Sequence, residues 1–169
     1  QLAYFSKKYR VIAVDTRGHG QAPRGAAPFT ISQFAEDLNA FLEQRDISKA
    51  VILGFSDGAN IAMRFAMKHP EKVEALILNG GNLNARGVKA SVQIPIELGY
   101  RMTKLFSRIS EKARKNHEML ALMVDDPNIE PSELKEIHVP TLVIAGTEDM
   151  IKEEHTKLLA AEIPGAELK

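Results

Sequence analysis

The sequence predicts an α/β fold in which a mainly parallel sheet is flanked by helices. Four short apolar runs are continuous, not alternating, which is typical of strands that helices cover on both faces. The runs occupy residues 11–14, 51–53, 75–78 and 142–145. Segments with helical spacing of apolar residues separate these runs, so strands and helices alternate along the chain.

Two helices are predicted around the second run. Apolar residues between Phe34 and Leu42 share one helical face behind Thr30, which can begin a capping box, and this pattern indicates a surface helix. Residues 59–69 are apolar nearly all round and stop before Pro70, as a central buried helix does.

Length and composition restrict the classes of function. The chain has 169 residues, the size of one ordinary domain, and its 22 basic and 22 acidic residues give no overall attraction to nucleic acid or to a membrane surface. The absence of cysteine excludes disulfides, thiolate catalysis and cysteine-based zinc sites, and it fits a cytoplasmic protein. No apolar run reaches the roughly 18 residues of a membrane span. Because Gln1 is not an initiator and residues 2–8 resemble the end of a helix, we expect that the chain was cut from a longer one.

A Gly-x-Ser-x-Gly pentad, from Gly54 to Gly58, lies between the second run and the predicted buried helix. A serine hydroxyl is a weak nucleophile unless a tight turn exposes it and a base takes its proton. Such a turn needs glycines, and we expect a side chain at position 54 or 58 to collide where strand turns into helix. Ser56 is therefore a candidate nucleophile.

A long insertion separates the third and fourth runs. It divides the chain into a first part of an α/β core (1–82), a helical lid (83–139) and a second core part (140–169). We expect the lid to pack through two apolar stripes, which consist of Leu98, Met102, Leu105, Phe106 and Ile109 and of Leu120, Met123 and Val124. Residues 86–115 contain eight basic residues and only two glutamates. Either this is a solvated helix face or it attracts an anionic substrate or partner.

Three motifs together resemble the α/β-hydrolase family. Residues 14–20 (Val-Asp-Thr-Arg-Gly-His-Gly) look like the turn after the family's fourth strand, the pentad like its nucleophile elbow and residues 146–149 (Gly-Thr-Glu-Asp) like its acid loop. The resemblance implies that Ser56 is the nucleophile and Asp149 the acid of a catalytic triad, with Glu148 as the fallback acid. Asp149 could instead cap the following helix.

The resemblance places the catalytic histidine after the last strand, beyond the end of this chain. His155 is the only histidine that follows Asp149, but it lies in the helix predicted over 152–162, so it is a weak candidate for the base. His19 is either a residue that lines the site or a structural part of its glycine turn. His69, His117 and His138 are expected on the surface or in packing.

The oxyanion hole of the family takes one backbone N–H from the residue after the nucleophile, here Asp57, and one from the loop after the third strand. No residues here match that loop. The third strand of the family lies between the strands that residues 11–14 and 51–53 would form, so a gap is expected there. We expect the chain to close it by re-pairing its own strands, or by borrowing a strand from another copy in a homo-oligomer.

The Asp57 carboxylate could bind a cationic group of the substrate, as in amino-acid ester hydrolases of the family, or hydrogen-bond to nearby backbone. The leading hypothesis is a serine hydrolase of small carboxylic esters or related acyl compounds, without a metal or another cofactor, and with little activity in this chain alone. A serine in place of aspartate argues against dehalogenase or epoxide hydrolase chemistry. Perhydrolase activity, carbon–carbon bond hydrolysis and a non-catalytic binding role remain alternatives, because the fold does not choose among them.

Overall fold

A computed structural model describes residues 1–169 and contains one four-stranded sheet in the order β1-β2-β3-β4. All three neighbouring pairs are parallel, and the strands are β1 (Ala50–Phe55), β2 (Val73–Asn79), β3 (Thr141–Ile144) and β4 (Glu167–Leu168). The predicted α/β class is confirmed, and the second, third and fourth apolar runs are strands. The short β4 was not predicted, because its two residues carry no apolar run.

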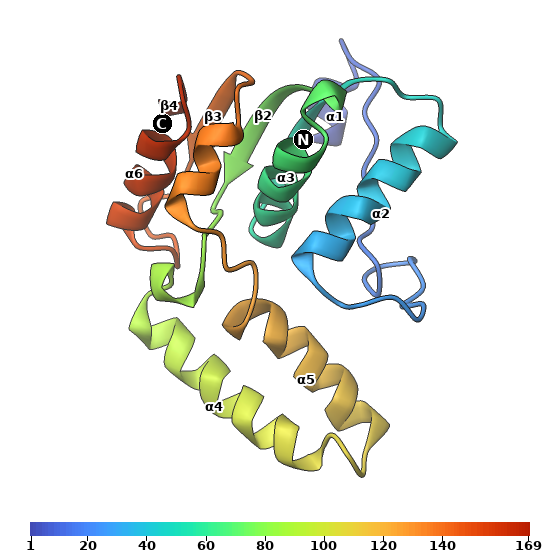
Figure 1. Ribbon diagram of the computed structural model, residues 1–169, viewed down its shortest axis with the longest axis vertical. Coiled ribbons are helices and arrows are strands. Elements are labelled where there is room, and N and C mark those ends of the chain that lie inside the picture. The colour runs from blue at the N-terminus through green and yellow to red at the C-terminus, as the bar shows by residue number, and fades with distance from the viewer.

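Helices cover this sheet and extend beyond it (Figure 1). The α-helices are α1 (Leu2–Phe5), α2 (Ile31–Gln44), α3 (Asp57–Lys68), α4 (Ala90–Phe106), α5 (Glu111–Val124) and α6 (Glu153–Glu162). Short 3-10 turns span Pro70–Lys72, Ala85–Gly87 and Pro131–Glu136. Helix α3 packs on β1 and β2, α2 packs on α3, and α6 packs on β3 and β4. The pair α4 and α5 projects past the ends of the strands to which the arrows point.

The predicted capping of α2 is present, and a contact from the segment after α5 reinforces it. The hydroxyl of Thr30 accepts a hydrogen bond from the backbone N–H of Gln33 at 3.1 Å. A carboxylate oxygen of Asp126, which follows α5, accepts from the N–H of Ile31 at 2.7 Å. Because the first N–H groups of a helix have no partner within the helix, both contacts stabilise α2. The second also joins the segment after α5 to the core.

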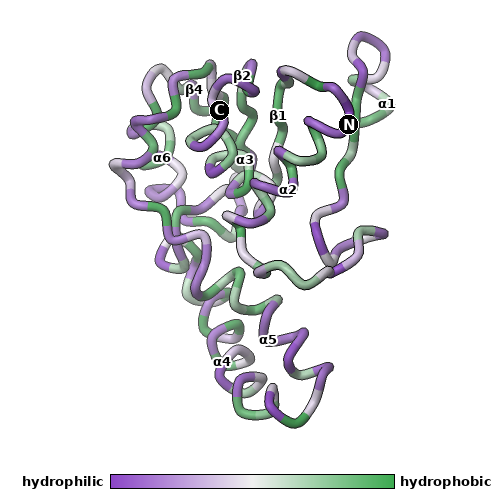
Figure 2. The backbone as a smooth tube through the Cα atoms, turned by 45° about the vertical axis from the view of Figure 1, so that its right-hand side comes forward, coloured by the Kyte–Doolittle hydropathy of each residue, from purple (hydrophilic) through white to green (hydrophobic).

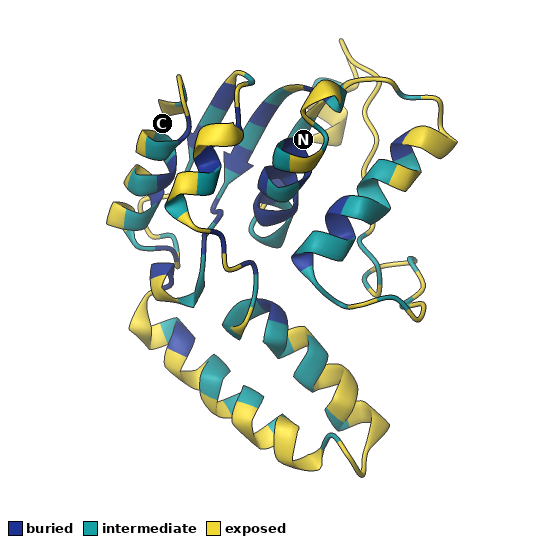
Figure 3. Ribbon diagram, in the orientation of Figure 1, coloured by how far each residue is buried: buried dark blue, intermediate teal, exposed yellow.

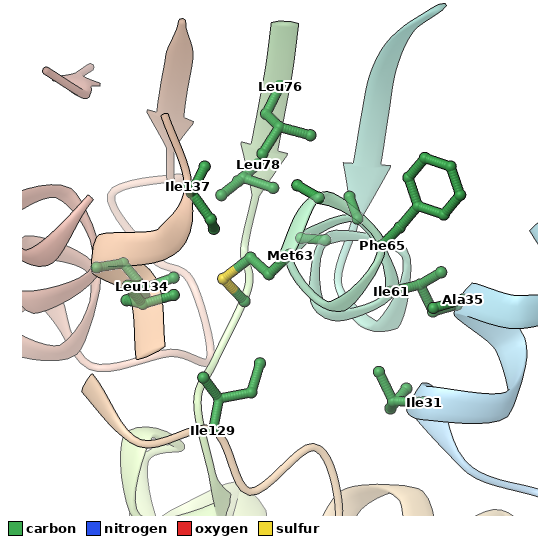
Figure 4. Packing of buried hydrophobic residues seen from close by; sticks show 14 of the residues in the cluster. Ile31, Ala35, Ile61, Met63, Phe65, Leu76, Leu78, Ile129, Leu134 and Ile137 are labelled. Carbon is green, nitrogen blue, oxygen red and sulfur yellow. The ribbon is translucent and has the colours of Figure 1, made fainter. Parts of the chain in front are cut away.

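Helix α3 lies at the centre of the apolar core, as its sequence predicts. In Figure 4 its side chains lie between those of β2, of α2 and of the segment that leads into β3. The fully buried members of this cluster include Met63, Phe65, Leu76, Leu78, Leu134 and Ile137. The core thus holds fixed the strand and the helix between which the pentad lies.

The first apolar run does not form the predicted strand. Residues 11–14 pair with no other strand, and the side chains of Val11, Ile12 and Val14 are 36%, 40% and 47% exposed. In Figure 2 this segment runs apart from β1. The expectation that the chain re-pairs its own strands is also wrong, because β1 remains an edge strand with Phe55 66% exposed. A strand needs a neighbour for its backbone hydrogen bonds, and none lies next to this run.

The lid region forms an antiparallel pair of helices, but the first predicted stripe is not packed. Leu98, Leu105 and Ile109 are 60%, 74% and 81% exposed, and exposed residues run along α4 in Figure 3. Helix α4 meets α5 with another face, on which the ring of Tyr100 stacks on that of His117 at 4.4 Å. Each helix of a hairpin can bury only the face that meets its neighbour, and in α4 that face is the more polar one. None of the helices has the length and apolar content that crossing a bilayer requires.

Candidate functional site

The pentad forms a sharp turn between β1 and α3. Ser56 has φ 53° and ψ −121°, a backbone conformation that residues with a side chain rarely adopt. Its N–H donates to the carbonyl of Asn79 in β2 at 2.8 Å, and its carbonyl accepts from the N–H of Ala59 at 2.8 Å. Its hydroxyl does not cap the helix and is only partly buried. The turn therefore holds the hydroxyl at the end of the strand, free of a capping bond.

Only one of the two pentad glycines is required by contacts within this chain. A Cβ atom on Gly54 would lie 2.1 Å from the carbonyl oxygen of Gly58, so no side chain fits there. A Cβ atom on Gly58 would meet nothing within 4 Å. The expected collision at position 58 is therefore wrong, because the space beside it is open.

Asp57 provides a free backbone donor next to Ser56. As the first residue of α3, it has an N–H that cannot bond within the helix, and no acceptor in the chain receives it. Burial raises the pKa of its carboxyl group, an effect that nearby Asp126 increases and the charge of His19 opposes. The N–H group points out of a helix N-terminus, where the backbone stabilises negative charge.

Asp149 reaches the same edge of the sheet. It follows β3, and its Oδ1 accepts from the N–H of Ile151 at 2.9 Å. Its Oδ2 lies over Gly80, where a Cβ atom would be 3.1 Å away, and Gly80 has φ 64°. Asp149 does not cap α6, since the N-cap residue is Lys152. Glu148, the fallback acid, is exposed.

The register of the sheet explains why these groups share one edge. Phe55, Asn79 and Ile144 are aligned across β1, β2 and β3 and are the last residues of their strands. Ser56 follows the first of these residues, and Asp149 is on the loop after the third. The Asp149 carboxylate extends back over the end of β2, the strand next to Ser56. The carboxyl ends of parallel strands are where open α/β sheets build their sites.

A pair of asparagines supports the turn, and sequence reasoning missed it. Buried Asn60 in α3 donates from Nδ2 to Oδ1 of Asn82 at 3.0 Å, and its Oδ1 accepts from the N–H of Asn82 at 2.9 Å. These bonds fix the loop after β2 beneath the first turn of α3. The adjacent Gly80 and Gly81 after a strand were a signal of a tight loop, but nothing in the sequence paired the two asparagines.

Four of the five histidines have other partners or positions. His69 pairs with Glu36 at 3.2 Å, and His117 stacks on Tyr100. His138 is exposed ahead of β3, at the opposite edge of the sheet. Nε2 of His155 accepts from the backbone N–H of Leu83 at 2.9 Å, so this nitrogen is not free to take the proton of a serine.

The remaining histidine, His19, is partly buried near the elbow. Its Nδ1 lies 3.1 Å from the carbonyl oxygen of Arg17, and its ring stacks on Phe29 at 5.9 Å. The edge of its ring also faces that of Phe34 in α2, with the ring centroids 6.4 Å apart. No group of three or more His, Cys, Asp or Glu side chains is arranged to hold a metal ion.

Comparison with known families agrees with this geometry. Residues 1–95 match the family described as the alpha/beta hydrolase fold. The chain belongs to the α/β-hydrolase family.

Relatives of this α/β-hydrolase chain include enzymes that act on different bonds. It is 26% identical to 3-oxoadipate enol-lactonase 2 of Acinetobacter baylyi over 89% of this chain and 66% of that protein. It is 34% identical to epoxide hydrolase 3 of Siraitia grosvenorii over 60% of this chain and 32% of that protein. The chain thus spans less than two thirds of the length of either relative.

Solved structures show the same fold. The chain superposes on Est816, described as an N-acyl homoserine lactone degrading enzyme, with a TM-score of 0.68 and 26% identity over 92% of this chain and 71% of that one. It superposes on the enol-lactonase of Burkholderia xenovorans with a TM-score of 0.75 and 24% identity over 99% of this chain and 74% of that one.

Proposed function

We propose that the protein is a serine hydrolase of small carboxylic esters, including cyclic esters, and that Ser56 forms the acyl-enzyme. The observation that carries this proposal is the strained turn at Ser56, which shares one sheet edge with the carboxylate of Asp149. Strained backbone at the end of a strand is costly, and it is found where a function requires it.

The chemistry assigns a role to each group. The Ser56 oxygen attacks the ester carbonyl carbon, and the carbonyl oxygen becomes an oxyanion next to the free N–H of Asp57. The serine proton passes to a base and then to the departing alcohol as the carbon–oxygen bond breaks. Water then gives a proton to the base and attacks the acyl carbon. The bond from that carbon to the Ser56 oxygen breaks, the carboxylic acid leaves, and the base returns the proton to Ser56. Asp149 would hold the protonated base in place and stabilise its charge.

The relatives support the choice of cyclic esters within this class. One relative is named an enol-lactonase, and one structural neighbour is described as degrading an N-acyl homoserine lactone, so both are named for compounds that contain a cyclic ester. The epoxide hydrolase relative argues for a wider range of reactions in the family. The serine at position 56 favours the acyl-enzyme route over epoxide opening.

Substrate recognition by Asp57 and His19 belongs to the same proposal. The partly buried carboxyl group of Asp57 would gain from a positively charged partner, since burial raises its pKa by disfavouring the charged form. A substrate ammonium group would supply that partner. His19 would line the site beside it.

A fluorophosphonate probe tests the nucleophile directly. We expect labelling of this chain to depend on Ser56, to be lost in Ser56→Ala, and to be slow because no histidine is placed as its base. Added imidazole should accelerate labelling of the chain and leave Ser56→Ala unlabelled. Labelling that persists in Ser56→Ala, or none with imidazole present, would contradict the proposal and favour a binding protein.

Hydrolysis of lactones and matched linear esters tests the substrate class. We expect weak turnover by this chain alone, because loss of one triad member leaves only about 10³ to 10⁴ over the uncatalysed rate. Faster cleavage of the lactone than of the linear ester would support cyclic esters as the substrate class. Faster cleavage of the linear ester would contradict this choice. Fast turnover without imidazole would mean that a histidine of this chain is the base.

A further inference from the structure

Two segments far apart in the sequence are joined beside Asp149. We call residues 83–89, from which the lid rises, the lid base, and residues 146–152 the acid loop. The N–H of Lys89 donates to the carbonyl of Met150 at 2.8 Å, and the N–H of Lys152 donates to the carbonyl of Gly87 at 2.8 Å. Val88 and Ile151 form an antiparallel bridge between these two bonds. Residues 87–89 of the lid base and 150–152 of the acid loop are therefore joined by one antiparallel bridge, which we call the ribbon.

His155 fastens the end of this ribbon. It lies in the first turn of α6, and its Nε2 accepts from the N–H of Leu83 at 2.9 Å. Its ring also fills the space above Gly87, where a Cβ atom would lie 2.4 Å from the ring carbon Cδ2. Leu83 and Gly87 are both buried. The imidazole thus contacts the lid base at two points, Leu83 and Gly87.

This contact requires the neutral form of the ring. A backbone N–H can only donate, so Nε2 must be without a proton. Burial lowers the pKa of His155, nearby Lys152 acts in the same direction, and Glu154 opposes it. The lid base and the acid loop also carry Arg86, Lys89, Glu148 and Asp149. Further charged groups lie on α6 and on the 3-10 turn packed against it: Glu153, Lys157, Glu162, Glu133, Lys135 and Glu136. Protonation of Nε2 would replace an acceptor with a second donor facing the N–H of Leu83.

We propose that His155 is a positioning residue that holds the lid base on the acid loop and thereby fixes the place of Asp149. The contacts run from His155 to Leu83 and Gly87, across the ribbon to Ile151, and from the N–H of Ile151 to Oδ1 of Asp149 at 2.9 Å. The lid and the acid loop then keep one relative position while the ring is neutral. The effect of this role on catalysis rests on the proposed function. The joint, by which we mean the contacts that hold the lid base on the acid loop, does not depend on it.

Hydrogen exchange of single amides tests the joint without any assay of activity. In His155→Leu the amides of Leu83, Lys89 and Lys152 should exchange roughly tenfold faster or more, because a buried donor loses its acceptor. In His155→Gln the side-chain oxygen can still accept from Leu83, so protection should be retained. Amides in the centre of β2 are the internal control and should not change in either variant.

The pH dependence separates positioning by a neutral ring from simple packing. After correction for intrinsic exchange, acidification should expose the same three amides in the wild-type chain and leave them protected in His155→Gln. Equal protection in all variants, or loss spread evenly over the sheet in His155→Leu, would overturn the proposal. Gly87→Ala should mimic His155→Leu, whereas Gly146→Ala should not, since a Cβ atom there meets nothing within 4 Å.

The labelling assay then connects the joint to the site. His155→Leu should reduce the imidazole-dependent part of Ser56 labelling, because Asp149 would no longer be held where it can orient the base, and His155→Gln should restore that part. If the chain is never labelled, the proposed function fails while the exchange data still decide the role of His155. Labelling unchanged in His155→Leu would remove its link to Asp149.

Discussion

Gly54 is the residue on which the shape of the turn at Ser56 depends most directly. Gly54→Ala would place a methyl group 2.1 Å from the carbonyl oxygen of Gly58, and neither backbone can move without displacing β1 or α3. We expect a loss of at least about 2 kcal/mol in the free energy of unfolding. Chemical denaturation followed by circular dichroism measures it.

Gly58→Ala is the matched control for that change. It adds the same methyl group to the same turn, in open space and within a helix, where alanine is favoured over glycine. Its stability should be equal to that of the wild-type chain or higher. Similar losses in both variants would show that the turn is not held by the contact at Gly54.

Asp57 makes the stability of the fold depend on pH. Its pKa is raised above the ordinary 3.8 by burial, so the folded state keeps the proton to higher pH than the unfolded state does. The stability that Asp57 contributes to the folded state is therefore greatest at low pH. It decreases as pH rises from 3.8 through the raised pKa and is lowest above that pKa. Asp57→Asn should be more stable than the wild-type chain at pH 7, and the difference should vanish below pH 3.8. Thermal melts at both pH values decide it.

Helices α4 and α5 show that periodicity identifies a helix but not what its apolar face contacts. The stripe on α4 predicted the helix correctly and its packing wrongly, because the neighbouring α5 contacts another face. Leu105 on α4 is 74% exposed, and Leu122 on α5 is 2% exposed.

This difference predicts opposite outcomes for one kind of substitution on adjacent helices. Leu122→Ala should cost about 2–5 kcal/mol because it leaves a cavity in the core. Leu105→Ala should change stability by less than about 0.5 kcal/mol. Denaturant titration of the two variants compares them, and an equal loss would mean that the stripe on α4 is covered in solution.

The whole molecule has an unpaired sheet edge along β1. Apolar side chains line it, with Val51 50% exposed and Leu53 38% exposed, and backbone groups on a free edge favour pairing with another chain. We therefore expect self-association through this edge, consistent with the strand exchange that the sequence suggested.

Sedimentation at several concentrations tests this. The wild-type chain should sediment above its monomer mass of 18.7 kDa, and Leu53→Lys should shift it toward the monomer. Leu98→Lys places the same charge on the exposed stripe of α4 and should leave the association unchanged. If Leu98→Lys dissociates the chain and Leu53→Lys does not, the interface lies on α4 and not on β1.

The sequence by itself determined the features that depend on neighbours along the chain. Continuous apolar runs identified three strands, capping and periodicity identified the helices, and the pentad and the resemblance of residues 146–149 made Ser56 and Asp149 the candidate site residues. Parallel pairing then requires that groups after the strands share one edge, so the position of this candidate site followed from the order of the elements.

Only the tertiary structure decided the features that depend on neighbours in space. Residues 11–14 have the composition of a strand but no partner for their hydrogen bonds, so they form none. Gly58 has open space beside it, Asn60 bonds to Asn82, and His155 accepts from the N–H of Leu83. Each of these depends on which atoms the folded chain places next to the residue. Local patterns encode which conformation a segment prefers, and packing decides which surface and which hydrogen-bond partner it finds.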